Sequence, residues 1–262
     1  MKNKIVLVLV DGMRPDGIMQ CGNSFLADLR AESTHCFHAA TVFPSVTLPC
    51  HTSLFLGVDP DRHGITDNLW MPQVRPVDGI FEAAHKADLK CAMFYNWQQL
   101  RDLCRPGTLD HAYFQRMAHD MEAAWEQERE MANLTIDYIK KESPDFTFLY
   151  IGSVDEIGHH YGWMGKEYLD TVAHASDCIK RVKEALPEGY QLIVTADHGG
   201  HDRTHGTRLP EDMTIPMLFW GSAFEKGKAL AEANIKDIAP TVAELLGVKP
   251  SEEWDGKSVL KA

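Results

Sequence analysis

Five short runs along the chain are hydrophobic at nearly every position. They cover residues Ile5–Val10, Leu89–Tyr95, Phe146–Ile151, Gln191–Ala196 and Ile215–Trp220. Continuous rather than alternating apolarity is typical of strands that are buried on both faces. The pattern therefore predicts five strands inside a sheet that is covered on both sides.

Three amphipathic stretches lie between or after these runs. Apolar side chains recur at helical spacing from Met121 to Ile139, from Tyr168 to Leu186 and from Ile238 to Leu246. Gly247, directly after the third stretch, is typical of the residue at which a helix ends. Strands that alternate with helices predict an α/β fold, here a three-layer α/β/α sandwich with a mainly parallel central sheet.

The chain has 262 residues and contains no Ser/Gly-rich linker, internal repeat or low-complexity tract. A chain of this length can bury one large core, and we expect a single domain over residues 1–262. The segment 71–144 carries few chemically active groups, which leaves open a small cap within it.

The net charge of −12 argues against a stable nucleic-acid partner, because neutralising phosphates requires clustered Lys and Arg. No apolar run approaches the roughly 18 residues of a membrane span. The N-terminal run is too short for a signal sequence and ends at Asp11. No two of the six cysteines form a C-x-x-C pair. We therefore expect a cytoplasmic protein with reduced thiols and no membrane partner. The oligomeric state is left open.

Carboxylate and imidazole side chains follow three of the predicted strands. Asp11 ends the first run, Asp155 closely follows the third, and Asp197 and His198 end the fourth. In open α/β sheets, ligands bind at the carboxyl ends of the strands. The sequence therefore predicts a functional site at this edge of the sheet. Taken singly, Asp11 could equally cap a turn, and Asp155 with His159 could belong to a solvated loop.

The segment from Asp197 to His205 places three histidines and two aspartates within nine residues, interleaved with glycine. Such a set suits Zn²⁺ and also Mn²⁺ or Fe²⁺. Together with Asp11, Asp155 and His159, these side chains are numerous enough to bind two divalent ions.

Thr47 has two interpretations that are compatible in position. It lies just before a predicted helix from about Pro49 to Leu56, so its hydroxyl could cap that helix. It could also be a nucleophile whose pKa is lowered by a metal, with the helix N-terminus facing an incoming phosphate.

These motifs together resemble the alkaline phosphatase superfamily, and within it the nucleotide pyrophosphatase/phosphodiesterase branch. The resemblance runs in the family's order from Lys4 to the C-terminus. Its motifs are Asp11-Gly-Met-Arg-Pro-Asp16, Pro44-Ser-Val-Thr47-Leu-Pro-Cys-His51, the segment from Gly57 to Asn68, Asp155-x-x-Gly-His159, Asp197-His198-Gly199, His205-Gly206 and the segment from Asp237 to Gly247. The chain departs from the family in having almost no insertion between His198 and the last histidine.

The resemblance implies two zinc ions held by two groups of side chains, with Asp155, His159 and a late histidine in one, and Asp11, Asp197 and His198 in the other. It implies that Thr47 is the nucleophile and contacts the metals. It also implies that Asn68 donates a hydrogen bond to a phosphate oxygen, although a turn residue is the simpler interpretation of Asn68.

Two histidines could be the late ligand, His201 and His205. We choose His205, because Gly206 follows it and the last apolar run begins about ten residues on. His51, His63 and His160 are expected outside the ligand set.

Further loop residues have structural or substrate-binding interpretations. Arg14 and Asp16 are expected to tie the first loop together. The aromatic side chains of Trp70, Trp163 and Tyr161 could stack on a substrate ring or simply pack.

The resemblance implies a metal-dependent hydrolase that cleaves phosphoric diesters or nucleotide pyrophosphate bonds through a phosphothreonine intermediate, with a small phosphate ester as substrate. Alternatives are a phosphomonoesterase or phosphonate hydrolase, a cofactor-independent mutase, and a metal- or ligand-binding protein without turnover. A monoesterase would need an additional cation, for which the candidates are Arg75, Arg101, Arg105 and Arg208. A sulfatase would need a Cys or Ser in the frame C/S-x-P-x-R, where this chain has Thr47 and His51.

Overall fold

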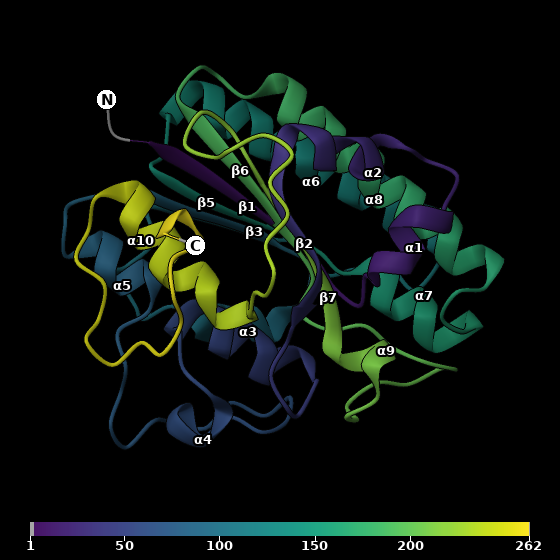
Figure 1. Cartoon of the computed structure of the whole chain (residues 1–262), viewed down its shortest axis with the longest axis horizontal. Coiled ribbons are helices and arrows are strands. Elements are labelled where there is room, and N and C mark those ends of the chain that lie inside the picture. The colour runs from purple at the N-terminus through teal and green to yellow at the C-terminus, as the bar shows by residue number, and fades with distance from the viewer. Residues whose placement is uncertain (1–2, 262) are drawn as a thin grey trace.

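Seven strands form one sheet in the computed structural model, which describes residues 3–261 (Figure 1). In chain order they are β1 (Lys4–Val10), β2 (Ser33–Ala40), β3 (Cys91–Tyr95), β4 (His111–Phe114), β5 (Phe146–Ile151), β6 (Tyr190–Thr195) and β7 (Thr214–Trp220). Across the sheet their order is β2-β7-β6-β1-β5-β3-β4. The pairings are parallel except at β7, which runs antiparallel to both of its neighbours.

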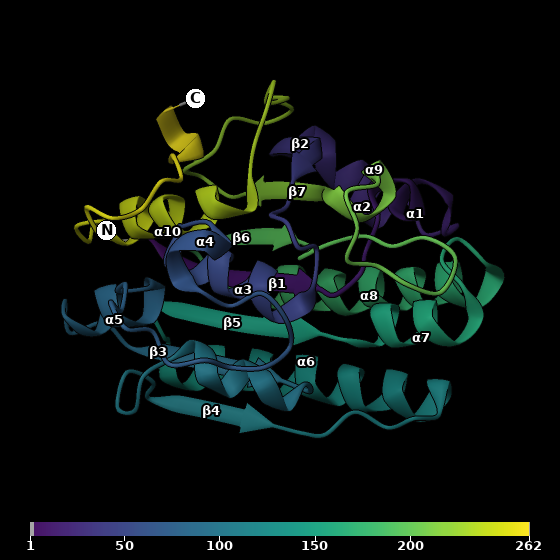
Figure 2. The same cartoon turned by 90° about the horizontal axis from the view of Figure 1, so that it is seen from below.

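Helices cover both faces of this sheet. They are α1 (Pro15–Gln20), α2 (Phe25–Leu29), α3 (Thr47–Leu56), α4 (Pro60–His63), α5 (Ile80–His85), α6 (Met121–Glu142), α7 (Ser153–Tyr161), α8 (Lys166–Ala185), α9 (Pro210–Met213) and α10 (Ile238–Leu246). Figures 1 and 2 show α3, α5 and α10 against one face of the sheet, and α6 and α8 against the other. The predicted three-layer α/β/α sandwich with a mainly parallel sheet is confirmed.

All five predicted strands are present, whereas β2 and β4 were not predicted. Every residue of β5 and β6 is buried, which is why their sequences are continuously apolar. The two missed strands lie at the edges of the sheet. In β2 the buried positions are interrupted by exposed or half-exposed ones, and in β4 every position is exposed or half-exposed. An edge strand meets solvent and therefore lacks the continuous apolar signal.

The segment 71–144 contributes α5, β3, β4 and α6 to the structure. Strands β3 and β4 pair with each other at the edge of the sheet, and α6 packs against α8. Among residues 3–261, no helix is both long and apolar enough to cross a membrane.

Aromatic side chains beneath its buried face hold helix α3 against the sheet and α5. All of its residues are buried, and the ring of Phe55 lies 5.0 Å from the rings of both Phe81 and Phe148. Ring contacts of this kind add stability beyond the area that they bury. The packing fixes the helix whose first residue is Thr47.

Candidate metal centre

The topology brings three carboxylates to one edge of the sheet. Strand β1 pairs with β5 on one side and with β6 on the other. Asp11 directly follows β1, Asp197 comes two residues after β6, and Asp155 lies in the first turn of α7, just after β5. Neighbouring parallel strands therefore deliver these side chains to a common point.

The first group of possible metal ligands is Asp11, Asp197 and His198. All three side chains are buried, and each offers one atom within 4.8 Å of the others. Nε2 of His198 lies 3.4 Å from Oδ1 of Asp11 and 3.2 Å from Oδ2 of Asp197. This is one of the two predicted ligand sets, now brought together in space.

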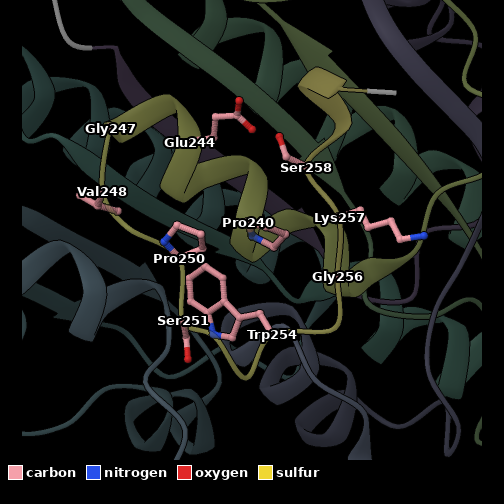
Figure 3. Close-up of a pocket in the computed structure, with 10 residues that line it drawn as sticks. All are labelled: Pro240, Glu244, Gly247, Val248, Pro250, Ser251, Trp254, Gly256, Lys257 and Ser258. Atoms are coloured by element: carbon pink, nitrogen blue, oxygen red, sulfur yellow. The ribbon is translucent and has the colours of Figure 1, made fainter.

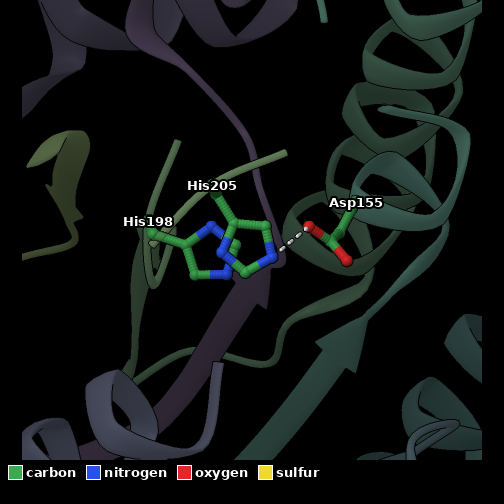
Figure 4. A group of neighbouring side chains, drawn as sticks. All are labelled: Asp155, His198 and His205. Atoms are coloured by element: carbon green, nitrogen blue, oxygen red, sulfur yellow. Dashed lines mark ion pairs between the residues drawn. The ribbon is translucent and has the colours of Figure 1, made fainter. Parts of the chain in front are cut away.

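The second group consists of Asp155, His198 and His205, whose ligand atoms also lie within 4.8 Å of one another. Nε2 of His205 is 3.5 Å from Oδ1 of Asp155, as the dashed line in Figure 4 marks. The rings of His198 and His205 stack with their centres 3.8 Å apart. His198 is therefore shared by the two groups.

His159, which the resemblance assigns to the second metal, lies at the border of this group. Its Nε2 is 3.5 Å from Oδ2 of Asp155, the oxygen that His205 does not face. Its Nδ1 is 2.9 Å from the carbonyl oxygen of Arg203. His159 is thus next to Asp155, but His198 completes the compact group in this structure.

The electrostatics of the cluster fit bound cations. Oδ1 of Asp11, Oδ1 of Asp155 and Oδ2 of Asp197 are buried without a hydrogen-bond partner. Burial, together with the charges of Asp197 and Asp155, raises the pKa of Asp11 well above its usual value. Uncompensated buried carboxylates are costly, and metal ions are a normal way to compensate them. The orphaned oxygens and the carboxylate–imidazole donor set therefore fit divalent metal ions.

Burial has the opposite effect on His198, whose pKa falls well below the usual value for histidine. The neutral imidazole, with a free lone pair, is the form that binds metals.

Hydrogen bonds from neighbouring groups orient the candidate ligands. The Tyr150 hydroxyl donates to Oδ2 of Asp11, and the Gly12 N–H donates to Oδ1 of Asp197 at 3.2 Å. Nδ1 of His205 lies 2.8 Å from the Ser45 carbonyl oxygen, which directs its Nε2 toward Asp155.

Thr47 is the first residue of α3, so the helix begins two residues earlier than predicted. The N-cap residue is Val46, and no side chain caps the helix. The cap interpretation of Thr47 is therefore wrong. Its hydroxyl oxygen lies 3.3 Å from Nε2 of His198, at the ligand cluster.

Asn68 reaches the same helix from twenty residues further along the chain. Its Oδ1 accepts a hydrogen bond of 3.0 Å from the N–H of Leu48, the residue after Thr47. Because the amide oxygen is used in this way, the NH₂ group remains a donor for a ligand next to Thr47.

The other histidines lie outside both ligand groups. Nδ1 of His201 is 2.7 Å from the buried carboxylate of Asp212. Nδ1 of His51 is 2.8 Å from the Thr47 carbonyl oxygen, and burial lowers the pKa of His51 to about 4. His63 is held between Ser53 and Ile65, and His160 pairs with Glu156 near the end of α7.

A family model described as type I phosphodiesterase / nucleotide pyrophosphatase matches residues 5–245. The chain belongs to this family. The match spans every residue of both ligand groups together with Thr47 and Asn68, and it places the chain in the alkaline phosphatase superfamily.

Two curated relatives are similar over part of the chain. One is 2,3-bisphosphoglycerate-independent phosphoglycerate mutase 2 of Methanosarcina barkeri, 29% identical over 138 residues, or 50% of this chain and 26% of the mutase. The other is GPI ethanolamine phosphate transferase 1 of Gibberella zeae, 29% identical over 164 residues, or 60% of this chain and 15% of the transferase. The matched part is thus about a quarter or less of either relative.

Two solved structures share the fold. Murine ectonucleotide pyrophosphatase/phosphodiesterase 5, as an inactive variant in complex with AMP, superposes with a TM-score of 0.78 at 17% identity, covering 95% of this chain and 96% of that one. Phosphonate monoester hydrolase of Agrobacterium radiobacter gives a TM-score of 0.74 at 13% identity, covering 99% of this chain and 76% of that one. At these identities the likeness shows the alkaline phosphatase-like fold.

Trp163 packs between two loops and a helix of this family member. Its Nε1 donates to the Gly12 carbonyl oxygen at 3.0 Å. A Cβ atom at Gly158 would lie 2.7 Å from the indole ring, and one at Gly200 would lie 2.2 Å from it. The ring thus fills the space between the Asp11 loop, α7 and the loop after His198. Because its side chain is buried, packing is the correct interpretation of Trp163.

The other two aromatic candidates are more accessible. Trp70 lines a cavity of about 230 Å³ beside Thr52 and Leu56 of α3, and the side chain of Tyr161 is exposed. A larger cavity of about 680 Å³ lies between α10 and the C-terminal segment (Figure 3). Its lining, which includes Trp254, contains none of the candidate ligands.

Sequence reasoning missed two residues that organise the site. Tyr150 holds Asp11, but it lies inside an apolar strand run that gave no chemical signal. Asp212 holds His201 and Thr207 and so shapes the loop that carries His205. No spacing pattern connects Asp212 to the motifs. Arg14 and Asp16 do pair, as expected, and Arg14 also donates to the Gly200 carbonyl oxygen.

Proposed function

We propose that the protein is a metal-dependent hydrolase of phosphoric diesters, including nucleotide pyrophosphate bonds. The observation that carries the proposal is the Thr47 hydroxyl, 3.3 Å from Nε2 of His198 at the N-terminus of a buried helix. Membership of the type I phosphodiesterase / nucleotide pyrophosphatase family supports a diester. The AMP bound in the murine neighbour supports a nucleotide as substrate.

We propose two divalent ions, with Zn²⁺ first and Mn²⁺ or Fe²⁺ as alternatives. One would be held by Asp11, Asp197 and His198. The other would be held by Asp155, His205 and the neighbouring His159. The ions would supply positive charge that lowers the pKa of the Thr47 hydroxyl and stabilises charge on the phosphoryl group.

Thr47 and Asn68 would carry out the two chemical steps of the reaction. The Thr47 hydroxyl gives its proton to water as its Oγ1 attacks phosphorus. An Oγ1–P bond forms while the bond between phosphorus and the leaving oxygen breaks, and that oxygen takes up a proton from water. A water molecule then attacks phosphorus, which releases the phosphate monoester and restores the threonine hydroxyl. The amide NH₂ of Asn68 and the backbone N–H of Thr47, at the N-terminus of α3, donate hydrogen bonds to the non-bridging oxygens.

A panel of four chromogenic substrates tests this proposal: a phosphodiester, a phosphomonoester, a phosphonate monoester and a sulfate ester. The protein is stripped of metal and then loaded with Zn²⁺ or Mn²⁺. We expect the diester to have the highest kcat/KM, the sulfate to be unreactive, and the metal-free protein to be inactive. A higher kcat/KM for the monoester would contradict the assignment as a diesterase. Full activity without metal would contradict the metal centre.

A further inference from the structure

Helix α7 carries two pairs of a carboxylate and a histidine, each pair spaced four residues apart. In the first pair, Nε2 of His159 lies 3.5 Å from Oδ2 of Asp155, at the candidate metal centre. In the second pair, one residue further along, Nε2 of His160 lies 3.2 Å from Oε1 of Glu156. Residues four apart face the same side of a helix, and a shift by one residue turns that direction by about 100°. The second pair therefore lies on a different side of α7 from the first.

Another histidine meets the second pair from a distant part of the chain. Nδ1 of His119, in the segment just before α6, lies 3.9 Å from Oε1 of Glu156. One carboxylate oxygen therefore faces two imidazoles. We call Glu156, His160 and His119 the surface cluster, because both histidines are exposed and Glu156 is half-buried. All three side chains lie outside the two ligand groups of the candidate metal centre.

The backbone on either side of His119 is fixed. The N–H of Ala118 donates to Oε1 of Gln127 at 2.7 Å. Asp120 is the N-cap residue of α6, where its Oδ1 accepts from the N–H of Ala123 at 3.0 Å. His119 therefore leaves the chain at a defined place next to α7. Only its side chain must be ordered when the cluster binds a ligand, which lowers the entropic cost of binding.

The separations within the surface cluster are close to those between metal ligands. Two ligand atoms bound to a tetrahedral zinc ion at the usual bond lengths lie about 3.3 Å apart. Oε1 of Glu156 lies 3.2 Å from His160 and 3.9 Å from His119. Because the His119 side chain is exposed, it is free to rotate and shorten the longer of these distances. The three side chains can thus converge on one ion.

The donor set of the surface cluster selects a class of metal. Two imidazoles and one carboxylate suit Zn²⁺, and also Ni²⁺ or Cu²⁺, whereas Mg²⁺ and Ca²⁺ prefer oxygen ligands. In open zinc sites with this set of protein ligands, water takes the fourth position. Exposed side chains lose more freedom when they bind than buried ones do. The surface cluster should therefore bind its ion more weakly than the buried candidate metal centre.

We propose that Glu156, His160 and His119 form a further divalent-metal site, separate from the candidate metal centre and selective for Zn²⁺-like ions. A bound ion would join α7 to the segment that leads into α6, a helix that contacts α7 (Figure 2). Asp155 precedes Glu156 on α7, so the ion would restrain the helix that carries a candidate ligand of the metal centre. The proposal does not depend on the reaction that the protein catalyses.

Zinc binding at controlled free Zn²⁺ tests the proposal. The protein is stripped of metal and dialysed against Zn²⁺ buffers that span about 1 nM to about 100 µM, and bound zinc per chain is measured by elemental analysis. The variants are Glu156→Gln, His160→Gln and His119→Gln, each of which removes one ligand from an accessible position. His85→Gln, which removes an exposed histidine on α5, is the control.

We expect one zinc equivalent with a Kd on the order of 1 µM, in addition to the zinc held at the candidate metal centre. Each of the three variants should weaken this equivalent about tenfold or more, because even the loss of a group that only orients a ligand costs about that much affinity. The more tightly bound zinc should be unchanged. His85→Gln should bind zinc as the unsubstituted protein does, and excess Mg²⁺ should not displace the weaker equivalent.

Three results would overturn the inference. The first is a zinc-binding curve that is the same in the unsubstituted protein and in all three variants. The second is an equal loss of the weaker equivalent in His85→Gln. The third is a loss of the more tightly bound zinc in place of the weaker equivalent, which would mean that Glu156 and His160 support the neighbouring Asp155 and His159 and do not form a site of their own.

Discussion

Nδ1 of His201 lies 2.7 Å from Oδ1 of Asp212, while Nε2 of His205 faces Asp155 at 3.5 Å. Asp212 is buried, and its other oxygen accepts from Thr207. His201 therefore stabilises the loop that carries both histidines, whereas His205 contacts the carboxylate cluster.

This arrangement predicts different effects for two alanine variants. His205→Ala should lose roughly one metal equivalent per chain and most of the activity, because a removed ligand weakens its metal site. His201→Ala should retain both equivalents and lose activity far less, since it supports the loop without reaching the cluster. Metal analysis and rates on both variants decide the matter. A metal loss confined to His201→Ala would reverse the assignment.

Asp11→Asn should stabilise the metal-free protein while weakening metal binding. Burial and the charges of Asp197 and Asp155 raise the pKa of Asp11, so the metal-free fold loses stability as pH rises through this raised value. Asparagine keeps an oxygen for the Tyr150 hydroxyl but removes the charge. We expect a gain of about 1 kcal/mol in the free energy of unfolding in EDTA, larger at pH 8 than at pH 5.

Urea unfolding at both pH values measures this gain, and metal analysis measures the loss of binding. Asp61→Asn, at an exposed carboxylate on α4, is the control and should change neither quantity. If Asp11→Asn is less stable than the unsubstituted protein in EDTA at pH 8, the carboxylate cluster does not carry the repulsion that we assign to it.

Glu128 of α6 should position the helix that carries Asp155. Its buried carboxylate accepts from the N–H and hydroxyl of Ser153 at 2.8 and 2.6 Å, and from Nδ2 of Asn96 at 3.1 Å. The N-cap residue of α7 is Gly152, which has no side chain that could accept hydrogen bonds in place of Glu128. Glu128→Ala leaves them unpaired, and we expect it to cost about 2 kcal/mol of stability and to weaken the Asp155 metal site.

Glu128→Gln keeps one acceptor oxygen and should lie between the alanine variant and the unsubstituted protein in both stability and metal affinity. Thermal unfolding and metal titration measure the two effects. Unchanged metal affinity in a destabilised Glu128→Ala would mean that this carboxylate supports the fold alone.

His63 should make the fold sensitive to mild acid. Its Nδ1 accepts from the Ile65 N–H at 3.0 Å and its Nε2 faces the Ser53 hydroxyl at 3.0 Å. Burial lowers the pKa of His63 from 6.5 to about 4. Stability is therefore unaffected above pH 6.5 and falls as the pH drops from 6.5 to 4, because the unfolded chain takes up the proton first.

His63→Gln removes this titration. Its stability should depend less steeply on pH in that window, by up to about 1.4 kcal/mol per pH unit, as urea unfolding at several pH values would measure. Equal slopes for the two proteins would show that His63 does not titrate as described.

The central strands were predictable from the sequence. Strands β5 and β6 are buried on both faces, so their sequences are continuously apolar. The edge strands β2 and β4 were not, since part of each faces solvent. In the candidate site, motif order pointed to Asp11, Asp197 and His198. The roles of Asp212 and Glu128 depend on contacts across 11 and 25 residues or more, which no local pattern records.

The role of Thr47 also depends on a contact between residues far apart in the chain. The sequence left its hydroxyl either capping a helix or facing a phosphate, because both need a residue at a helix N-terminus. The structure distinguishes them in two ways: Val46 is the N-cap residue, and the Thr47 hydroxyl lies beside His198, which is 151 residues away along the chain.

The central claim is that the Thr47 hydroxyl is the nucleophile, and trapping the intermediate tests it most directly. Zn²⁺-loaded protein is mixed with the p-nitrophenyl ester of thymidine 5′-phosphate, quenched in acid within milliseconds and analysed by peptide mass spectrometry. We predict a nucleotidyl group on Thr47 of the unsubstituted protein and of Ser45→Ala. In Thr47→Ala we predict none, with metal content retained, and a rate lower by several powers of ten. A nucleotidyl group on Ser45, or a Thr47→Ala rate above about a hundredth of normal, would contradict the account.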